Sequence, residues 1–580
     1  MAEYGIKQQE LGNFTEAEKA LKQALISLPN HAFALNSLGI INTVRGNLDE
    51  AIALSEKSLA INPTNEWAHC NIGIAEALKG NTNKAIQHYL NAISINSQNS
   101  DIYKKFADVL SSAEIHAGAV SLYEKALNLD AKNTGAWTNL GLVLQRLGKI
   151  DEAIYAFKTS INIAPSISAY SSLLLAMHYS DKFGPEAIFD EAQRFAALFA
   201  PETLKLPPAR PDLNPERKLN IGYMSADFRN HPVAYFLKNT LCNCDKNNFE
   251  IFCYSNSIIT DEYTKTLQKY ADHWLNISTM DDNAVAKKIR ADNIDILVDL
   301  SGHTGLHRLT LFARKPAPIQ ATWIGYSGTT GMQQMDYIIC SEELTYPGLE
   351  KFFSEKFMPV AGHIGSLDIS FCKAEVAVLP ALKKGEITFG CFNSLAKLNP
   401  KVIALWAKIL TNVPASVLYL KADVFKEEVW KNEYYNLFAN YGIAKDRLRL
   451  ENASAKTEYY YAYNEVDIAL DPFPYNGGIT TMDTLWMGVP VITLAGKTTP
   501  ARFGTSILTN AGYSEWIADS EEEYLAKAIA LSSDIEKLAK IRSEMRNKLE
   551  NNILYHPSLF TRNLERKFRE VWREYCNNAV

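Results

Sequence analysis

The sequence lacks the cysteine spacing and the long apolar runs that mark several large classes of protein. Its eight cysteines are scattered over 580 residues, with no paired CxxC spacing for zinc and no dense set for a disulfide framework. No apolar run approaches the roughly 18 to 20 residues that span a bilayer, and the first twenty residues lack the basic-then-apolar pattern of a signal peptide. We therefore expect a cytoplasmic protein that makes no use of a membrane.

An excess of positive charge is absent as well. The formal net charge is −6, which gives no reason to expect a nucleic-acid partner or a polybasic membrane anchor. Any acidic ligand must therefore be held by a local arrangement of groups. A hydrophobic content of 47% over this length predicts two to four globular domains, each with its own core.

Small residues recur every 34 positions in the first part of the chain, which is the period of tetratricopeptide repeats. One register holds Gly5, Gly39, Gly73, Ala107 and Gly141, and a second holds Ala17, Ala51, Ala85, Ala119 and Ala153. A third holds Gly12, Gly46, Gly80, Glu114 and Gly148, and a fourth marks the repeat ends at Pro29, Pro63, Ser97, Ala131 and Pro165. Each hairpin can bury its apolar face only against the next, so residues 1–165 predict an all-α superhelix. We expect the first repeat to be incomplete.

The polar residues of these repeats leave the function of the array open. Asn71 and Asn139 occupy the same position in their repeats, where Ser37 and Lys105 stand in two others. One interpretation is a solvated helix face. The other is a concave groove in which the asparagines bind the backbone of a peptide.

The second part of the chain has a different pattern. Residues 166–216 read as a helical connector followed by the proline-rich "LKLPPARPDLNPERK", which is typical of a linker. From there, short apolar runs such as "KLNIGYMS" and "DILVDLSG" alternate with helical spacing, and the rhythm restarts at "EITFGCFNS". We predict two doubly wound α/β domains, at 217–380 and 381–580. Ligands of such folds bind at the carboxyl ends of the strands.

The stretch "DPFPYNGGITTMDTLWMGVPVITL" places turn residues and hydroxyls between two apolar runs. "DIALD", which ends at Asp471, predicts a buried strand, and the stretch then predicts a turn through Gly477 and Gly478 and a helix that begins near Thr480. A helix start offers free N–H groups and partial positive charge, so it can bind phosphate, while Thr481 adds a hydroxyl and Asp483 a carboxylate. The alternative is a helix cap without any ligand.

Four strings together resemble glycosyltransferase family 41, which contains the O-linked N-acetylglucosamine transferases and the SPINDLY-type O-fucosyltransferases. They are "IGYMSADFRNHPVAYF", "ILVDLSGHTGLHRLTLFARKPAPIQATWIGYSGTTGMQQMDYII", "FGCFNSLAKLNPKVIALWAKIL" and "DIALDPFPYNGGITTMDTLWMGVP", in the order found in the family. With the repeats before them, the resemblance covers nearly the whole chain. It implies a GT-B fold that uses a nucleotide sugar without a metal or other cofactor. The absence of any Asp-x-Asp motif is compatible with this.

The resemblance also implies roles for individual residues. Asp227 and His231 match groups near the reacting centre, and Lys397 matches the lysine that contacts the diphosphate, so we expect these three to be catalytic. Lys456 matches a lysine near the nucleotide base, and Thr480 and Asp483 match phosphate and ribose contacts. The remaining expected nucleotide-sugar ligands are Asn393, Tyr459, Gly477, Gly478, Thr481, Gly302 and His303.

Some positions depart from the animal enzymes of the family. Gly478 and Ile479 stand where those enzymes have histidine and threonine, and Tyr459 replaces a base-stacking histidine. The string around His303 and Arg308 is closer to SPINDLY and bacterial members. These departures leave the sugar and the nucleotide open.

The functional hypothesis is an inverting transferase that moves N-acetylglucosamine from UDP-N-acetylglucosamine to Ser or Thr of proteins bound along the repeat groove. The repeats could also join two copies of the chain as a homodimer. The alternatives are O-fucosyl transfer from GDP-fucose, a nucleotide-binding scaffold without catalysis, and transfer to an acceptor that is not a protein.

Overall fold

The computed structural model describes residues 1–209, 211–370, 372–454 and 456–579, without the side chains of Lys456 and Thr457. The chain folds into two compact units. The first consists of Met1–Gln145 and Tyr155–Pro165, and the second of Arg146–Ile154 and the chain from Ser166 onward. We describe each unit by itself.

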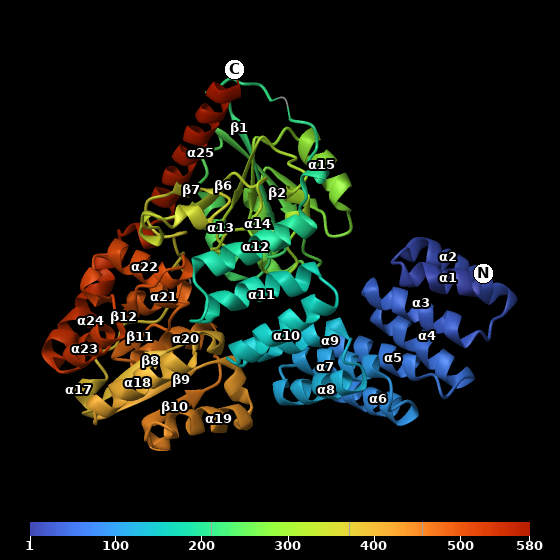
Figure 1. Ribbon diagram of the computed structural model, residues 1–580, viewed down its shortest axis with the longest axis horizontal. Coiled ribbons are helices and arrows are strands. Elements are labelled where there is room, and N and C mark those ends of the chain that lie inside the picture. The colour runs from blue at the N-terminus through green and yellow to red at the C-terminus, as the bar shows by residue number, and fades with distance from the viewer. Residues whose placement is uncertain (210, 371, 455, 580) are drawn as a thin grey trace. The chain divides into compact units, whose positions relative to one another are not determined.

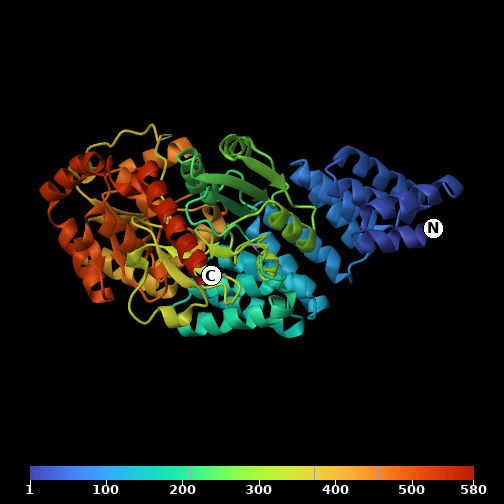
Figure 2. The same ribbon diagram turned by 90° about the horizontal axis from the view of Figure 1, so that it is seen from above.

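The first unit is built from antiparallel helix hairpins, drawn in blue to cyan in Figures 1 and 2. Successive pairs of helices pack together, α1 with α2, α3 with α4, α5 with α6 and α7 with α8. Their bounds are α1 Ala2–Glu10, α2 Phe14–Ser27, α3 Ala32–Val44, α4 Leu48–Ile61, α5 Glu66–Leu78, α6 Thr82–Ile95, α7 Ser100–Ser112 and α8 His116–Leu129, and then come α9 Thr134–Arg146 and α10 Ile150–Ile163. The predicted repeat array is confirmed.

The 34-residue registers have separate structural reasons. The alanine register is buried throughout, with at most 2% of any member exposed. The glycine register lies where two helices of a hairpin meet, because a Cβ at Gly73 would lie 2.8 Å from the ring of Tyr89 and one at Gly141 would lie 2.5 Å from the ring of Phe157. The third register forms the turns. All five of its members have positive φ, including Glu114 at 59°, which is the conformation that favours glycine.

The two repeat asparagines contact the neighbouring repeat. The side-chain amide of Asn71 donates to Oδ1 of Asn36 at 2.7 Å, and that of Asn139 donates to Oδ1 of Asp108 at 2.7 Å. Both bonds join the first helices of adjacent repeats. They give these residues a structural role, and the peptide-binding interpretation stays a prediction.

The second unit contains two parallel sheets. Within the described residues, the first sheet has seven strands in the order β3-β2-β1-β4-β5-β6-β7. The order places the chain reversal between β1 and β4, where Ile221 pairs with Ile296. The strands are β1 Leu219–Ser225, β2 Phe249–Ser255, β3 His273–Asn276, β4 Ile296–Asp299, β5 Ile319–Thr322, β6 Tyr337–Cys340 and β7 Lys356–Pro359.

The second sheet repeats this topology. Over the same described ranges it has six strands in the order β10-β9-β8-β11-β12-β13, with the reversal between β8 and β11. Its strands are β8 Ile387–Cys391, β9 Ser416–Lys421, β10 Leu448–Glu451, β11 Ile468–Leu470, β12 Val491–Leu494 and β13 Ile517–Ala518. The central strands are apolar and buried on both faces, as parallel strands covered by helices must be. The prediction of two doubly wound domains is confirmed.

Helices cover both sheets (Figure 1). Their bounds are α11 Ile167–Tyr179, α12 Pro185–Phe199, α13 Pro232–Cys242, α14 Glu262–Tyr270, α15 Asp282–Ala291, α16 Leu309–Phe312, α17 Ala381–Lys384, α18 Pro400–Asn412, α19 Glu428–Ala439, α20 Lys456–Ala462, α21 Ile479–Trp486, α22 Phe503–Ala511, α23 Glu521–Ser532, α24 Ile535–Leu549 and α25 Pro557–Ala579. The last helix, α25, returns to the first sheet, where Phe560, Leu564 and Trp572 join a core that contains Ile221 and Val298. The two sheets are therefore tied together at this end of the chain.

Two classes of feature are absent from the described part of the chain. One is a helix long and apolar enough to cross a membrane. The other is a group of three or more histidine, cysteine or acidic side chains with a geometry that could hold a metal ion.

Candidate functional site

A cavity of about 320 Å³ lies between the two sheets, at the carboxyl ends of their strands. His231 reaches it from the loop after β1, Asn393 from the loop after β8, and Gly478 from the loop after β11. These are the strands at which each sheet reverses its order, where doubly wound folds bind ligands. The other lining residues are Tyr179, Pro232, Val233, Phe236, Ile324, Gly325, His363, Ile364, Ser394, Lys397, Tyr475, Ile479, Thr480 and Phe503. The structure thus brings together five of the residues predicted from sequence.

Helix α21 presents its first turn to this cavity. The helix predicted near Thr480 begins at Ile479, with Gly478 as its cap residue. The hydroxyl of Thr480 donates to Oδ1 of Asn393 at 2.8 Å, which joins the helix start to the loop after β8. Because the first N–H groups of a helix lack partners within the helix, this turn can bind an anionic oxygen in the cavity.

Lys397 lies on the same side of the cavity. Its Nζ donates to Oδ1 of Asn393 at 3.0 Å and to the main-chain oxygen of Asn476 at 2.8 Å, and it lies 4.9 Å from the ring centre of Tyr475. Burial lowers the pKa of Lys397 to about 8, while the carboxylate of Asp471 opposes that shift. Near neutral pH the ammonium form still predominates, so the side chain can neutralise a phosphate.

The carboxylate of Asp471 packs against the turn that precedes α21. Its Oδ1 accepts the N–H of Gly477 at 2.7 Å, and its Oδ2 accepts the hydroxyl of Thr493 at 2.6 Å. A Cβ at Gly477 would lie 2.4 Å from Oγ1 of Thr481 and 2.8 Å from Oγ1 of Thr480. Gly477 and Thr481 therefore shape the turn from inside the protein, whereas Gly478 lines the cavity.

The expected ribose and base ligands lie beside α21. Asp483 is buried and accepts a hydrogen bond from the hydroxyl of Tyr460 at 2.7 Å. Tyr459 shares a 2.7 Å hydrogen bond with Tyr463, whose hydroxyl in turn donates to the main-chain oxygen of Thr480 at 3.4 Å. None of these four side chains lines the cavity of 320 Å³. The side chain of Lys456 lies outside the described part of the chain.

His231 caps helix α13 and faces the cavity. Its Nδ1 accepts the N–H of Val233 at 3.3 Å and lies 3.6 Å from Oδ2 of Asp227, which also pairs with Arg229 at 3.2 Å. Burial lowers the pKa of His231, so the neutral ring predominates at neutral pH. Because a backbone N–H can only donate, the neutral ring carries its proton on Nε2. In this arrangement His231 is a hydrogen-bond donor to a ligand.

Gly302 and His303 do not reach the cavity. Both ring nitrogens of His303 are engaged inside the protein, Nε2 with the main-chain oxygen of Thr330 at 3.2 Å and Nδ1 with the hydroxyl of Ser171 at 3.0 Å. Burial lowers the pKa of His303 to about 3, which keeps the ring neutral. Through these hydrogen bonds, His303 connects helix α11 to the loops that follow the strands of the first sheet. Its predicted role as a sugar-nucleotide ligand stays a prediction.

Two tyrosines of the cavity were not among the residues selected from sequence. Tyr179, at the end of α11, stacks on Tyr475 with ring centres 4.7 Å apart, and Tyr475 lies beside Lys397. Tyr475 belongs to the "DPFPYNGG" string, so its position could have been noticed. Tyr179 lies almost 300 residues earlier in a connector helix, and no pattern in the sequence relates it to the cavity.

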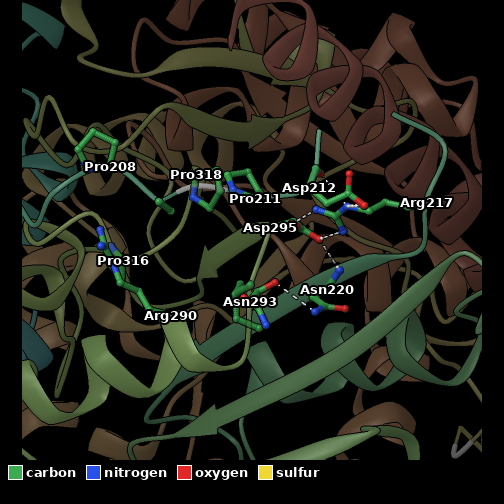
Figure 3. A pocket seen from close by; sticks show the side chains of 12 residues that line it. Pro208, Pro211, Asp212, Arg217, Asn220, Arg290, Asn293, Asp295, Pro316 and Pro318 are labelled. Atoms are coloured by element: carbon green, nitrogen blue, oxygen red, sulfur yellow. Dashed lines mark hydrogen bonds and ion pairs between the residues drawn. The ribbon is translucent and has the colours of Figure 1, made fainter. Parts of the chain in front are cut away.

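A second cavity, of about 420 Å³, lies at the opposite edge of the first sheet (Figure 3). It is lined by the proline-rich linker and by residues at the amino ends of β1, β4 and β5. Two charged side chains of its lining form an ion pair, in which Arg217 donates to both carboxylate oxygens of Asp295 (Figure 3). This cavity contains none of the residues predicted to bind a ligand.

Comparison with family models matches residues 202–373 and 379–564 to glycosyl transferase family 41. Residues 5–66 and 122–155 match tetratricopeptide repeats. A curated relative from Solanum lycopersicum, the probable UDP-N-acetylglucosamine–peptide N-acetylglucosaminyltransferase SPINDLY, is 34% identical over 424 residues, which is 72% of this chain and 45% of the relative. The corresponding protein SEC of Arabidopsis thaliana is 29% identical over 443 residues, 73% of this chain and 45% of its own. The chain thus spans about half the length of these relatives.

Among solved structures, a mutant of the Thermobaculum terrenum O-GlcNAc transferase superposes with a TM-score of 0.83 at 33% identity. The match covers 89% of this chain and 99% of that one. Repeat helices followed by two Rossmann-like domains are therefore common to both proteins, and the expected GT-B architecture is confirmed.

Proposed function

Because the chain belongs to glycosyltransferase family 41, we propose that it transfers a sugar from a nucleotide donor to a Ser or Thr hydroxyl of a protein. The proposed donor is UDP-N-acetylglucosamine, the sugar nucleotide in the names of its curated relatives. One observation carries the proposal. The cavity between the sheets places Lys397 and the first turn of α21 on one side and His231 on the other.

The groups of the second sheet suit a departing nucleoside diphosphate. As the glycosidic bond breaks, negative charge grows on the leaving phosphate oxygens, and a fixed cation nearby lowers the barrier. Lys397 is held by two hydrogen bonds, so it needs little reorganisation to meet that charge. The N–H groups at the start of α21 add partial positive charge. We propose that these groups serve where other transferases use a metal ion.

The groups of the first sheet suit the acceptor. With its proton on Nε2, His231 orients the acceptor by donating a hydrogen bond, and Asp227 lies 3.6 Å from Nδ1 on the other side of the ring. An oxygen of the donor diphosphate then receives the proton of the attacking hydroxyl. The hydroxyl attacks the anomeric carbon from the face opposite the leaving group, so the reaction inverts that centre. The repeats bring the acceptor protein to the cavity.

The experiment that tests the proposal is transfer of radiolabelled N-acetylglucosamine to protein acceptors by wild type and Lys397→Met. Loss of the cation should reduce turnover by roughly 100-fold or more, with an unchanged circular dichroism spectrum. Lys408→Met is the matched control, because Lys408 lies on the exposed side of the neighbouring helix α18. Equal activity of Lys397→Met and wild type would remove the proposed role of the cation.

A further inference from the structure

Asp471 is a buried carboxylate that no step of the proposed reaction uses. It is 2% exposed and follows the end of β11, behind the turn that leads into α21. Its two oxygens accept from different donors, Oδ1 from the N–H of Gly477 and Oδ2 from the hydroxyl of Thr493. A buried carboxylate is costly unless its surroundings compensate.

A single peptide group lies between Asp471 and Lys397. This group joins Asn476 to Gly477. Its N–H donates to Asp471 at 2.7 Å, and its carbonyl oxygen accepts from Nζ of Lys397 at 2.8 Å. The anion thus contacts the positive end of the peptide dipole and the cation contacts the negative end. Hydrogen bonds to ionised groups are about twice as strong as neutral ones, and bonds in such a chain strengthen each other.

We propose that Asp471 is a positioning residue, which holds Lys397 in place and in its charged form through the peptide group before Gly477. The proposal rests on the proposed function only where it assigns Lys397 to a diphosphate. In the described part of the chain, the carboxylate of Asp471 is the group that binds the N–H of Gly477, and its loss would leave that N–H without this partner. The carbonyl would then be free to turn away from the lysine.

The charges around Lys397 support this role. Among the described groups that favour its ammonium form, the carboxylate of Asp471 has the largest effect. Burial works in the other direction and lowers the pKa of Lys397 to about 8. The remaining titratable side chains of the cavity are His231, His363, Tyr179 and Tyr475. Burial lowers the pKa of both histidines and raises that of both tyrosines, so all four are neutral near pH 7.

The test measures the protonation of Lys397 directly. Acetic anhydride labels only unprotonated amines, and mass spectrometry gives the labelling rate of this lysine as a function of pH. In wild type we expect a midpoint near pH 8. In Asp471→Asn we expect a midpoint lower by about one pH unit, because a nearby negative charge is lost. Thr493→Val is the matched control, since it removes a hydrogen bond from Asp471 and leaves the carboxyl group in place.

Two results would overturn the proposal. One is an unchanged midpoint in folded Asp471→Asn, and the other is the same downward shift in both variants, which would assign the effect to packing. UDP binding supplies a second readout. With a midpoint one unit lower, Asp471→Asn should bind UDP about fivefold more weakly than wild type at pH 8 and almost equally at pH 6. Failure of wild type to bind UDP would refute the proposed function, whereas the labelling result would stand.

A further measurement applies if Asp471→Asn does not fold. Burial raises the pKa of Asp471 to about 6, so this carboxyl is mostly neutral at pH 5 and mostly ionised at pH 7. Lys397 stabilises the ionised form. The melting temperature of Lys397→Met should therefore fall relative to wild type between pH 5 and pH 7. A difference that is the same at both pH values would contradict the proposal.

Discussion

Substitution of the two adjacent glycines of the turn, Gly477 and Gly478, should distinguish an effect on packing from an effect on ligand binding. A Cβ at Gly477 would meet Oγ1 of Thr481 at 2.4 Å and Oδ1 of Asp471 at 3.0 Å. A Cβ at Gly478 would have Phe503 as its nearest neighbour, at 3.8 Å, and it would project into the cavity that Gly478 lines. We therefore expect Gly477→Ala and Gly478→Ala to fail in different ways.

The expected magnitudes follow from these distances. Gly477→Ala forces buried hydroxyls and a carboxylate apart, and overpacking of this kind costs about 1–3 kcal/mol of stability. Gly478→Ala meets only ordinary van der Waals contact, so its free energy of unfolding should stay within about 0.5 kcal/mol of wild type. If phosphate oxygens approach the start of α21, the new methyl group occupies their space. Losing such contacts should weaken UDP binding at least about tenfold, or about 1.4 kcal/mol.

The assay pairs thermal melting with calorimetric titration of UDP for both variants. We expect a lower melting temperature and weaker binding for Gly477→Ala. For Gly478→Ala we expect a normal melting temperature and weak binding. Wild-type affinity in Gly478→Ala would show that the phosphates do not approach this helix, and wild-type stability in Gly477→Ala would refute the packing argument.

Three further predictions concern pH, the connector helices and the repeat turns. UDP affinity should fall as pH rises through about 8, because the pKa of Lys397 is lowered to about 8 and only the ammonium form binds phosphate; titrations from pH 6.5 to 9 check this, and a flat profile would contradict it. A chain that begins at Ser166 should keep the melting temperature that the second unit has in the full chain. A chain that begins at residue 201 should have a lower melting temperature, because it loses the contact of α11 with His303. Equal melting temperatures of the two shortened chains would contradict this prediction. Gly46→Ala should destabilise the repeats by about 1 kcal/mol, because φ is 81° there, a conformation that strains any residue with a Cβ; urea unfolding checks this, and an unchanged free energy of unfolding would contradict it.

Features with a short sequence period or a local string could be predicted. The turn glycines of the repeats repeat every 34 residues, so one conformational requirement, positive φ, left a visible register. The helix at Thr480 and the lysine at position 397 were recognisable because each stands in a contiguous string of its own. Their meeting at one cavity follows from the parallel topology, which places the carboxyl ends of all strands at one edge.

Features that depend on distant packing could not be predicted. Tyr179 reaches the cavity only because α11 packs on the first sheet, and α25 returns to that sheet across the whole second domain. His303 stands in a family string, yet its two nitrogens are occupied by Ser171 and Thr330, and spacing carries no information about such partners. The sequence predicted Asp471 only as the last residue of a buried strand. In the structure its carboxylate accepts the N–H of Gly477 and so stabilises the turn.

The most direct test of the central claim is calorimetric titration of UDP and GDP into wild type and Lys397→Met. We expect UDP to bind wild type more tightly than GDP does, and we expect the substitution to weaken UDP binding about tenfold or more, because the lysine contacts the diphosphate. A preference for GDP would contradict the proposed donor and favour fucosyl transfer. Absence of binding by either nucleotide would contradict the proposed cavity and favour a scaffold without catalysis.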